Sequence, residues 1–140
     1  IFPSQANGNL VSVDGETVGA ENVGQEFTED YYMWSRPSAY HYNVYTEEDG
    51  KQTYSDGTEF AGLSSGSNNY APSNPALTER VEADIEKFLE KNPDVKREDI
   101  PTDLLTASGS GLDPHISPKS AEIQIPRIAE ASGLSEEKIE

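Results

Sequence analysis

The sequence predicts an α+β fold, a single domain in which early β-hairpins are followed by amphipathic helices. Strand and turn patterns gather in the first 60 residues, and amphipathic helix patterns gather after residue 73. Of the 140 residues, 34% are hydrophobic, so we expect one modest core. Residues 1–140 are therefore interpreted as one domain.

The first predicted element is a β-hairpin within residues 10–18. Valine recurs on both sides of Asp14-Gly15, and this pair favours the positive φ angles of a type I′ turn. Aromatic side chains then cluster from Phe27 to Tyr45, a pattern that is more typical of irregular core packing than of a ligand cage.

Residues 46–64 are predicted to form a surface insertion. Their composition shifts to polar residues with glycine, aspartate and serine, which favour exposed turns. Two Asp-Gly pairs, at positions 49 and 56, indicate a second, solvent-exposed hairpin with residues 51–54 as its strand.

The clearest helix pattern spans residues 73–92. Ser73 or Asn74 can cap it, and Pro75 suits the first turn, where its missing N–H costs nothing. An Asn-Pro pair ends the pattern. Its apolar residues form one stripe, which consists of Leu77, Val81, Ile85, Phe88 and Leu89.

A second helix is predicted to begin at Ser117-Pro118 and to end at Gly133, which suits the left-handed position after a helix. Pro126 lies inside this pattern and removes a backbone hydrogen bond, so the helix should kink or open in its middle turn. A third helix start follows at Ser135, which can cap it. The apolar stripe of the second helix consists of Ala121, Ile125, Ile128 and Ala129.

The chain is strongly acidic, with 26 acidic residues against 10 basic ones and a net charge of −16. Such a surface repels nucleic acids and anionic lipids and attracts cations. Because there is no cysteine, disulfides and thiolate metal sites are excluded. The chain lacks an initiator methionine, ends within the third helix pattern and has no run of 18 apolar residues. We therefore expect a soluble fragment of a longer protein.

No catalytic constellation is recognised in the sequence. Ser108 or Ser110 could form a triad with Asp113 and His115 on paper. However, the sequence has no nucleophile elbow, and Asp113 and His115 are too close in sequence to be arranged like a triad. His41 is the only other histidine, so a transition-metal site is not expected either. We predict neither catalytic residues nor metal ligands.

The run Ser108-Gly109-Ser110-Gly111 is the only glycine-rich turn with several hydroxyls, and it lacks the lysine of a phosphate-binding loop. Backbone amides in such a turn can hold an anion. Alternatively, the two glycines take backbone angles that other residues avoid. From the residues alone, a tight turn is favoured over an anion site.

Several separated blocks, in order along the chain, resemble the KdpC family of accessory subunits of Kdp-type potassium-transporting ATPases. The long block at residues 103–118, together with Ser-Asn-Pro-Ala-Leu and Arg-Pro-Ser-Ala, makes the resemblance specific. The chain departs from the family's pattern in its long 46–64 segment and in Tyr-Ala-Pro before Ser-Asn-Pro-Ala-Leu. The blocks are residues 5–8, 24–27 with 36–39, 67–68 leading into 73–77, 103–118 and 124–127.

The resemblance implies a non-catalytic accessory subunit of an ATP-driven potassium uptake pump. Its partners would be the potassium-translocating and ATP-hydrolysing subunits. It would support assembly and act as a catalytic chaperone that promotes ATP binding, with Ser108, Ser110 and Gln124 as the expected nucleotide contacts. The alternative is a structural cap on the translocating subunit without nucleotide contact. The family's single N-terminal transmembrane helix would anchor it in the cell membrane, with this domain on the extracytoplasmic side.

Overall fold

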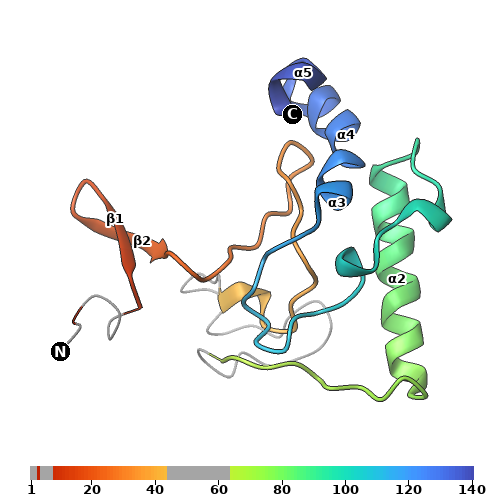
Figure 1. Ribbon diagram of the computed structural model, residues 1–140, viewed down its shortest axis with the longest axis horizontal. Coiled ribbons are helices and arrows are strands. Elements are labelled where there is room, and N and C mark those ends of the chain that lie inside the picture. The colour runs from red at the N-terminus through yellow and green to blue at the C-terminus, as the bar shows by residue number, and fades with distance from the viewer. Residues whose placement is uncertain (1–2, 4–7, 44–63) are drawn as a thin grey trace.

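The computed structural model describes residue 3, residues 8–43 and residues 64–140 (Figure 1). The predicted second hairpin and residues 46–63 of the predicted insertion lie outside these residues. A two-stranded antiparallel sheet precedes helices α2 to α5, so the predicted α+β class is confirmed. In chain order, with η for 3-10 helices, the elements are β1 (Leu10–Val13), β2 (Glu16–Ala20), η1 (His41–Asn43), α2 (Pro75–Lys91), η3 (Arg97–Asp99), η4 (Thr102–Leu104), α3 (Pro118–Glu122), α4 (Ile125–Ser132) and α5 (Glu136–Ile139).

Strands β1 and β2 form the predicted hairpin. Asp14 and Gly15 have φ angles of 52° and 87°, the two positive values that a type I′ turn needs. Leu10 pairs with Ala20, and a register irregularity lies between Val11 and Ser12. The hairpin stands away from the helices as a separate projection (Figure 1).

Helix α2 confirms the capping and stripe predictions. The Asn74 side chain accepts a hydrogen bond from the Ala76 N–H at 3.0 Å, so Asn74 rather than Ser73 is the cap. Pro75 occupies the first helical turn. Ile85 and Phe88 of the predicted stripe are buried.

The second predicted helix is interrupted in its middle, as we predicted from the position of Pro126. It is divided into α3 and α4, and Pro126 lies in the first turn of α4, where a missing N–H is tolerated. Gly133 ends α4 with a φ of 72°. Ser135 precedes α5 as predicted, but its side chain makes no capping hydrogen bond.

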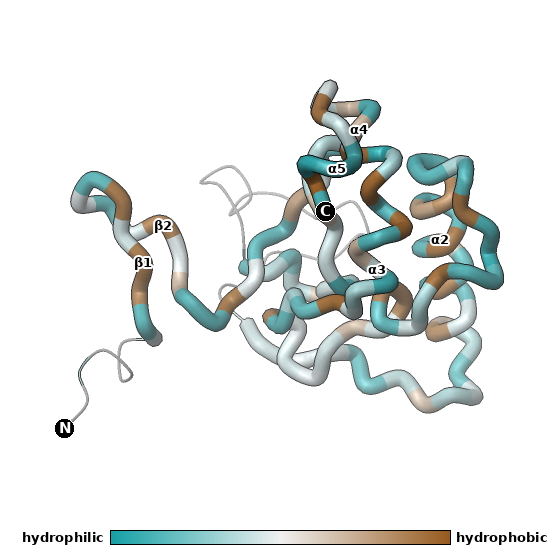
Figure 2. Tube along the Cα trace, turned by 45° about the horizontal axis from the view of Figure 1, so that its top comes forward, coloured by the Kyte–Doolittle hydropathy of each residue, from teal (hydrophilic) through white to brown (hydrophobic). Residues whose placement is uncertain are grey.

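The core lies between α2 and the segments that cross it. It consists of Ile85, Phe88, Ile100 and Leu104. Trp34 packs against this cluster, and its ring is in a T-shaped arrangement with that of Phe88. Figure 2 shows hydrophobic residues on α2 and on the α3–α4 segment beside it, and also on both strands of the hairpin. Within the described residues, none of the helices has the length and hydropathy that crossing a membrane requires.

The aromatic cluster divides into a packed part and an exposed part. Trp34 packs against the core and Tyr42 is buried, as predicted for irregular core packing. Phe27, Tyr31 and Tyr32 are 41%, 46% and 43% exposed, so for these three rings the prediction of core packing is wrong.

Candidate functional site

The loop of residues 106–113 is held at both ends by Arg36. Its Nε donates to the Thr106 carbonyl at 3.0 Å, and its Nη2 donates to the Ala107 carbonyl at 3.3 Å. Its Nη1 lies 3.4 Å from a carboxylate oxygen of Asp113. The planar guanidinium therefore joins the two ends of the loop through several donors, which the single ammonium of a lysine would not do.

Ser38 and Tyr42 hold the middle of the same loop. The Ser38 hydroxyl donates to the Gly111 carbonyl at 2.6 Å and accepts the Tyr42 N–H at 3.2 Å. Tyr42 is 4% exposed and donates its hydroxyl to the Arg36 carbonyl at 2.6 Å. Burial raises the pKa of the Tyr42 hydroxyl, so it remains a neutral donor at physiological pH.

Residues 41–43 form a left-handed turn beside the loop. His41, Tyr42 and Asn43 have φ angles of 49°, 53° and 57°, a conformation that costs about 1–2 kcal/mol per residue. Asn43 exchanges two side-chain hydrogen bonds with the backbone of Ser64, at 2.9 and 3.0 Å. The His41 ring lies 2.9 Å from the Glu26 carboxylate. These contacts, with the buried Tyr42, hold the strained turn in place.

Ser108 and Ser110, two of the predicted nucleotide contacts, lie with their hydroxyl oxygens 3.3 Å apart. Ser108 is 7% exposed, and its hydroxyl accepts the Asp113 N–H at 3.4 Å. The exposed Ser110 accepts the Leu112 N–H at 3.1 Å, while its carbonyl accepts the Gly66 N–H at 2.6 Å. The backbone N–H groups of the two residues that follow the glycine-rich turn are thus bonded to the turn's hydroxyls.

Of the two glycines in this run, only Gly111 has the special backbone conformation that the sequence suggested for both. Its φ is 68°, and a Cβ there would lie 2.5 Å from the Gly66 carbonyl oxygen. Gly109 has no positive φ and has open space where a Cβ would lie, so the expectation was wrong for Gly109. The close approach to Gly66 is the physical reason for glycine at 111.

Gln124, the third predicted nucleotide contact, belongs to a different network. It is fully buried, and its amide forms a two-way bridge with the backbone of Trp34, at 2.9 and 3.0 Å. The same amide donates to the Ser120 carbonyl at 2.9 Å and accepts from Arg127 Nη2 at 2.8 Å. Both amide hydrogens and the amide oxygen therefore bind atoms of the chain itself.

Arg127 completes this second network. Its guanidinium lies over the Trp34 ring, 4.3 Å from the ring centroid, and only 6% of the residue is exposed. Nε donates to Asn92 Oδ1 at 3.1 Å, and Nη1 donates to the carbonyls of Asp30 and Tyr32. The charge is thus satisfied by carbonyl oxygens and an aromatic face, a role that the sequence analysis did not assign.

Asp113 and His115 contact each other, although their spacing of two argued against a triad arrangement. His115 Nδ1 contacts the Asp113 carboxylate, and the His115 N–H donates to the same carboxylate at 3.0 Å. The His115 backbone and side-chain hydrogen bonds hold the pKa of Asp113 below its usual range. In the described part of the chain neither Ser108 nor Ser110 is bonded to His115, so these residues form a pair and not a triad.

Asp103 braces the start of α3. Its carboxylate accepts the Ser117 N–H at 2.7 Å, the Ser120 hydroxyl at 2.7 Å and the Ser117 hydroxyl at 3.2 Å. Ser117 itself caps α3, accepting the Ser120 N–H at 3.2 Å. Burial raises the pKa of Asp103, but these hydrogen bonds outweigh it and leave the pKa below the usual value.

Replacing Asp103 with asparagine is expected to lower the free energy of unfolding by about 1–2 kcal/mol at pH 7. Because the folded-state pKa is depressed, this stabilisation is fully present above the unfolded pKa of about 4 and is lost as the pH falls through the folded pKa. Urea unfolding of both proteins at pH 7 and pH 3 measures the difference. Asp99→Asn, at an exposed position, is the control. A deficit of equal size at both pH values would contradict the assignment.

A groove of 430 Å³ lies beside the loop and is lined by three segments that are distant in sequence. Residues 37–39, residues 67–70 and residues 106–107 contribute to it, together with Leu77, Arg80 and Asp84 of α2. Arg80 and Asp84 form an ion pair at 2.6 Å, and burial raises the pKa of Asp84 in spite of that partner. The sequence analysis missed this pair, although its i, i+4 spacing on the predicted helix was visible.

Comparison with known proteins identifies the family. The KdpC family, described as K+-transporting ATPase, c chain, matches residues 1–140. The chain belongs to the KdpC family. It is 56% identical over 140 residues to the potassium-transporting ATPase KdpC subunit of Clostridium kluyveri, covering all of this chain and 64% of that protein. The KdpC subunits of Clostridioides difficile and Caldanaerobacter subterraneus are 57% and 48% identical over 139 residues, which are 67% and 63% of their lengths. The chain thus spans about two-thirds of the KdpC subunits that it matches.

The groove and the loop of residues 106–113 are both built from segments that resemble the KdpC family. Blocks on which the family resemblance rested, residues 36–39, 67–68 and 103–118, each contribute to the groove lining. These blocks are far apart in sequence, and Arg36 and Ser38 join the first of them to the block at 103–118. Within the described residues, the chain has no group of three His, Cys, Asp or Glu side chains placed to bind a metal ion.

Proposed function

We propose that this chain is a domain of a non-catalytic accessory subunit of an ATP-driven potassium uptake pump, and that it supports assembly of the pump through protein contacts. The observation that carries the proposal is the KdpC family match over all 140 residues. The names of the relatives describe subunits of a potassium-transporting ATPase. The partners under this proposal are the potassium-translocating and ATP-hydrolysing subunits.

The hydrogen bonding of the site supports a role through protein contacts. The Arg36 guanidinium and the Ser38 hydroxyl are bonded to the loop of residues 106–113, and the Gln124 amide is bonded to Trp34, Ser120 and Arg127. Groups that bind a small ligand must give up such partners, which costs free energy. A rigid scaffold that presents its surface to another protein needs no such rearrangement.

The proposal places the domain on the extracytoplasmic side of the cell membrane, as the outer cap of the translocating subunit. The net charge of −16 disfavours adsorption to anionic lipid, so contact with a protein is the physically favoured interaction there. The same charge enriches cations near the domain by a small factor that added salt screens.

A domain-deletion experiment tests the assembly role. The full-length subunit and a version without residues 8–140 would each be co-expressed with the other pump subunits. We expect the deletion to reduce both recovery of the intact complex and potassium-stimulated ATPase activity. As a control, the amount of the shortened subunit in the membrane fraction is measured. This measurement separates loss of assembly from loss of expression. Full recovery and full activity of the deletion complex would contradict the proposal.

The exposed Ser110 favours a second candidate function, the catalytic chaperone that promotes ATP binding. In this case Ser108, Ser110 and Gln124 would contact the nucleotide, and the turn would have to exchange the Ser110–Leu112 hydrogen bond for a phosphate. Amide NMR of the chain with millimolar ATP separates the two candidates. Shifts at residues 108–112 and at Gln124 would favour the chaperone role, and their absence is expected for the structural role.

A further inference from the structure

Exposed large apolar side chains gather in one short stretch of the chain. Ten such side chains are exposed among the described residues, and eight of them lie between positions 10 and 32. Groups of exposed large apolar side chains mark interaction sites in soluble domains. The eight residues are Leu10, Val11, Val13, Val18, Val23, Phe27, Tyr31 and Tyr32, and we call them the arm surface.

The hairpin part of the arm surface has little support from the rest of the domain. Strands β1 and β2 contact each other closely, and helices α2 to α5 lie apart from the hairpin (Figure 1). Leu10 and Val13 are 57% and 56% exposed, and Val18 is 48% exposed. A lone two-stranded hairpin is marginal in water, so a covering partner would stabilise it.

The base of the hairpin is nevertheless fixed to the domain. Gln25 Nε2 donates to the Val18 carbonyl at 3.1 Å, and the Gly24 N–H donates to the Leu112 carbonyl at 2.9 Å. A Cβ at Gly24 would lie 2.7 Å from both Tyr42 and Pro114, so only glycine permits this close approach. The arm is therefore presented in a defined direction, which reduces the entropy lost on binding.

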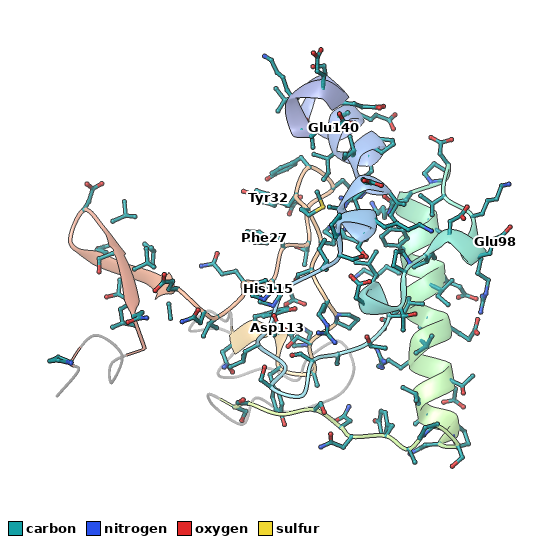
Figure 3. All side chains as sticks on the ribbon, viewed as in Figure 1. Phe27, Tyr32, Glu98, Asp113, His115 and Glu140 are labelled. Atoms are coloured by element: carbon teal, nitrogen blue, oxygen red, sulfur yellow. The ribbon has the colours of Figure 1, made fainter. Side chains whose placement is uncertain are left out.

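The aromatic part of the arm surface is also ordered. The rings of Phe27 and Tyr32 have centroids 4.9 Å apart, and those of Tyr31 and Tyr32 are 4.6 Å apart. The Tyr32 carbonyl accepts from the buried Arg127 at 3.1 Å, which fixes the backbone beneath the rings. Figure 3 shows Phe27 and Tyr32 at the edge of the domain from which the hairpin projects. Rigid, exposed aromatic rings are typical anchors of protein interfaces.

The charge of the segment identifies the chemistry of the partner. Residues 1–35 contain six acidic residues and no lysine or arginine. Lys91 pairs with Asp30, and His41 pairs with Glu26. The remaining acids, Asp14, Glu16, Glu21 and Glu29, are all exposed around the arm surface. Such a surface repels a second copy of this chain and an anionic membrane, and it complements a protein surface that is apolar with basic residues at its rim.

We propose that the arm surface docks onto an apolar, basic-rimmed surface of another protein. Taking that protein to be a subunit of the potassium pump rests on the function proposed above. The hairpin and the Phe27–Tyr31–Tyr32 rings supply the apolar contact, and the four exposed acids supply the charge pairing. The pairing should weaken as salt is raised, because exposed charges are screened over about 8–10 Å at physiological ionic strength.

Site-specific photo-crosslinking in the full-length protein, co-expressed with the other pump subunits, tests the proposal. Benzoylphenylalanine would replace Val18 and Tyr32. The matched controls are Ala131 and Leu134, which are exposed and lie outside the arm surface and the groove. We expect adducts with another pump subunit from Val18 and Tyr32 only. Adducts from the control positions alone, adducts with a second copy, or no protein adducts in an intact complex would each overturn the arm surface while leaving the proposed function standing. Failure of any pump subunit to co-purify with the unmodified protein would overturn both.

Paired substitutions give a second, quantitative readout. Val13→Lys with Val18→Lys adds two positive charges to the arm, and Ala131→Lys with Leu134→Lys adds the same charge at exposed positions outside the arm surface and the groove. We expect complex recovery to fall at least tenfold for the arm pair and to change less than twofold for the control pair. Because the hairpin packs mainly on itself, the core should fold in both variants, which circular dichroism of the purified subunits checks. Equal recovery for the two pairs would overturn the proposal.

Discussion

Replacement of Arg127 with methionine is expected to lower the free energy of unfolding of this chain by about 3 kcal/mol. Methionine fills a similar volume over the Trp34 ring but offers no donor. The Asn92 side chain and the Gln124 amide oxygen each lose their bond to the guanidinium, as do two loop carbonyls. Each buried acceptor left without a partner costs about 1–3 kcal/mol, and relief of the buried charge recovers part of that loss.

Urea unfolding followed by tryptophan fluorescence measures this effect, because Trp34 is the only tryptophan and lies against the substituted side chain. Arg97→Met is the matched control. Arg97 pairs with Glu82 at the surface, where its side chain is 52% exposed, and an exposed pair contributes about 0–1 kcal/mol. A loss for Arg127→Met no larger than that of the control would show that the buried network contributes little to stability.

Elements with local signals were predicted closely from the sequence. Asn74 and Pro75 define the start of α2 because a cap and a first-turn proline act within one turn of helix. Pro126 opens the segment between α3 and α4 because its ring lacks the N–H that a continuous helix requires. Asp14-Gly15 places the hairpin turn for an equally local reason, namely its two positive φ angles.

Contacts between distant segments could not be predicted in this way. The bond between the Trp34 N–H and Gln124 joins residues 90 positions apart, and no periodicity encodes it. Arg36 carries no local signal that distinguishes a loop clamp from a solvated arginine. The exposure of Phe27, Tyr31 and Tyr32 was missed because aromatic residues are frequent both in cores and in interfaces.

The sequence therefore predicted where the candidate site lies better than it predicted what the side chains of the site bind. The sequence analysis singled out the turn at residues 108–111 and the block at 103–118, and the structure gives that segment contacts with residues 36–42 and 65–66. Hydroxyl and amide side chains can bond either to a ligand or to the chain, so residue type alone could not decide between these roles. Direct nucleotide contact by Ser108, Ser110 and Gln124 stays a prediction.

Replacing Gln124 with leucine is expected to lower the free energy of unfolding by about 3 kcal/mol. Leucine has a similar size, so the loss reports the amide rather than a cavity. The two-way bridge to Trp34 is removed, and the Ser120 carbonyl and the Arg127 guanidinium each lose a partner. Since these groups are buried, water cannot replace the amide without opening the junction between α3 and α4.

Gln25→Leu is the matched control, because the exposed Gln25 makes a single hydrogen bond to the Val18 carbonyl and should lose less than about 1 kcal/mol. Urea unfolding of the two variants and the unmodified chain, combined with ATP titration of each, separates a structural role from a ligand-binding one. A structural Gln124 gives a large stability loss that is independent of ATP. Unchanged stability together with loss of an ATP-induced shift would instead identify Gln124 as a nucleotide contact. A side chain that bonds to the ligand and not to the chain contributes to ligand binding without stabilising the unliganded fold.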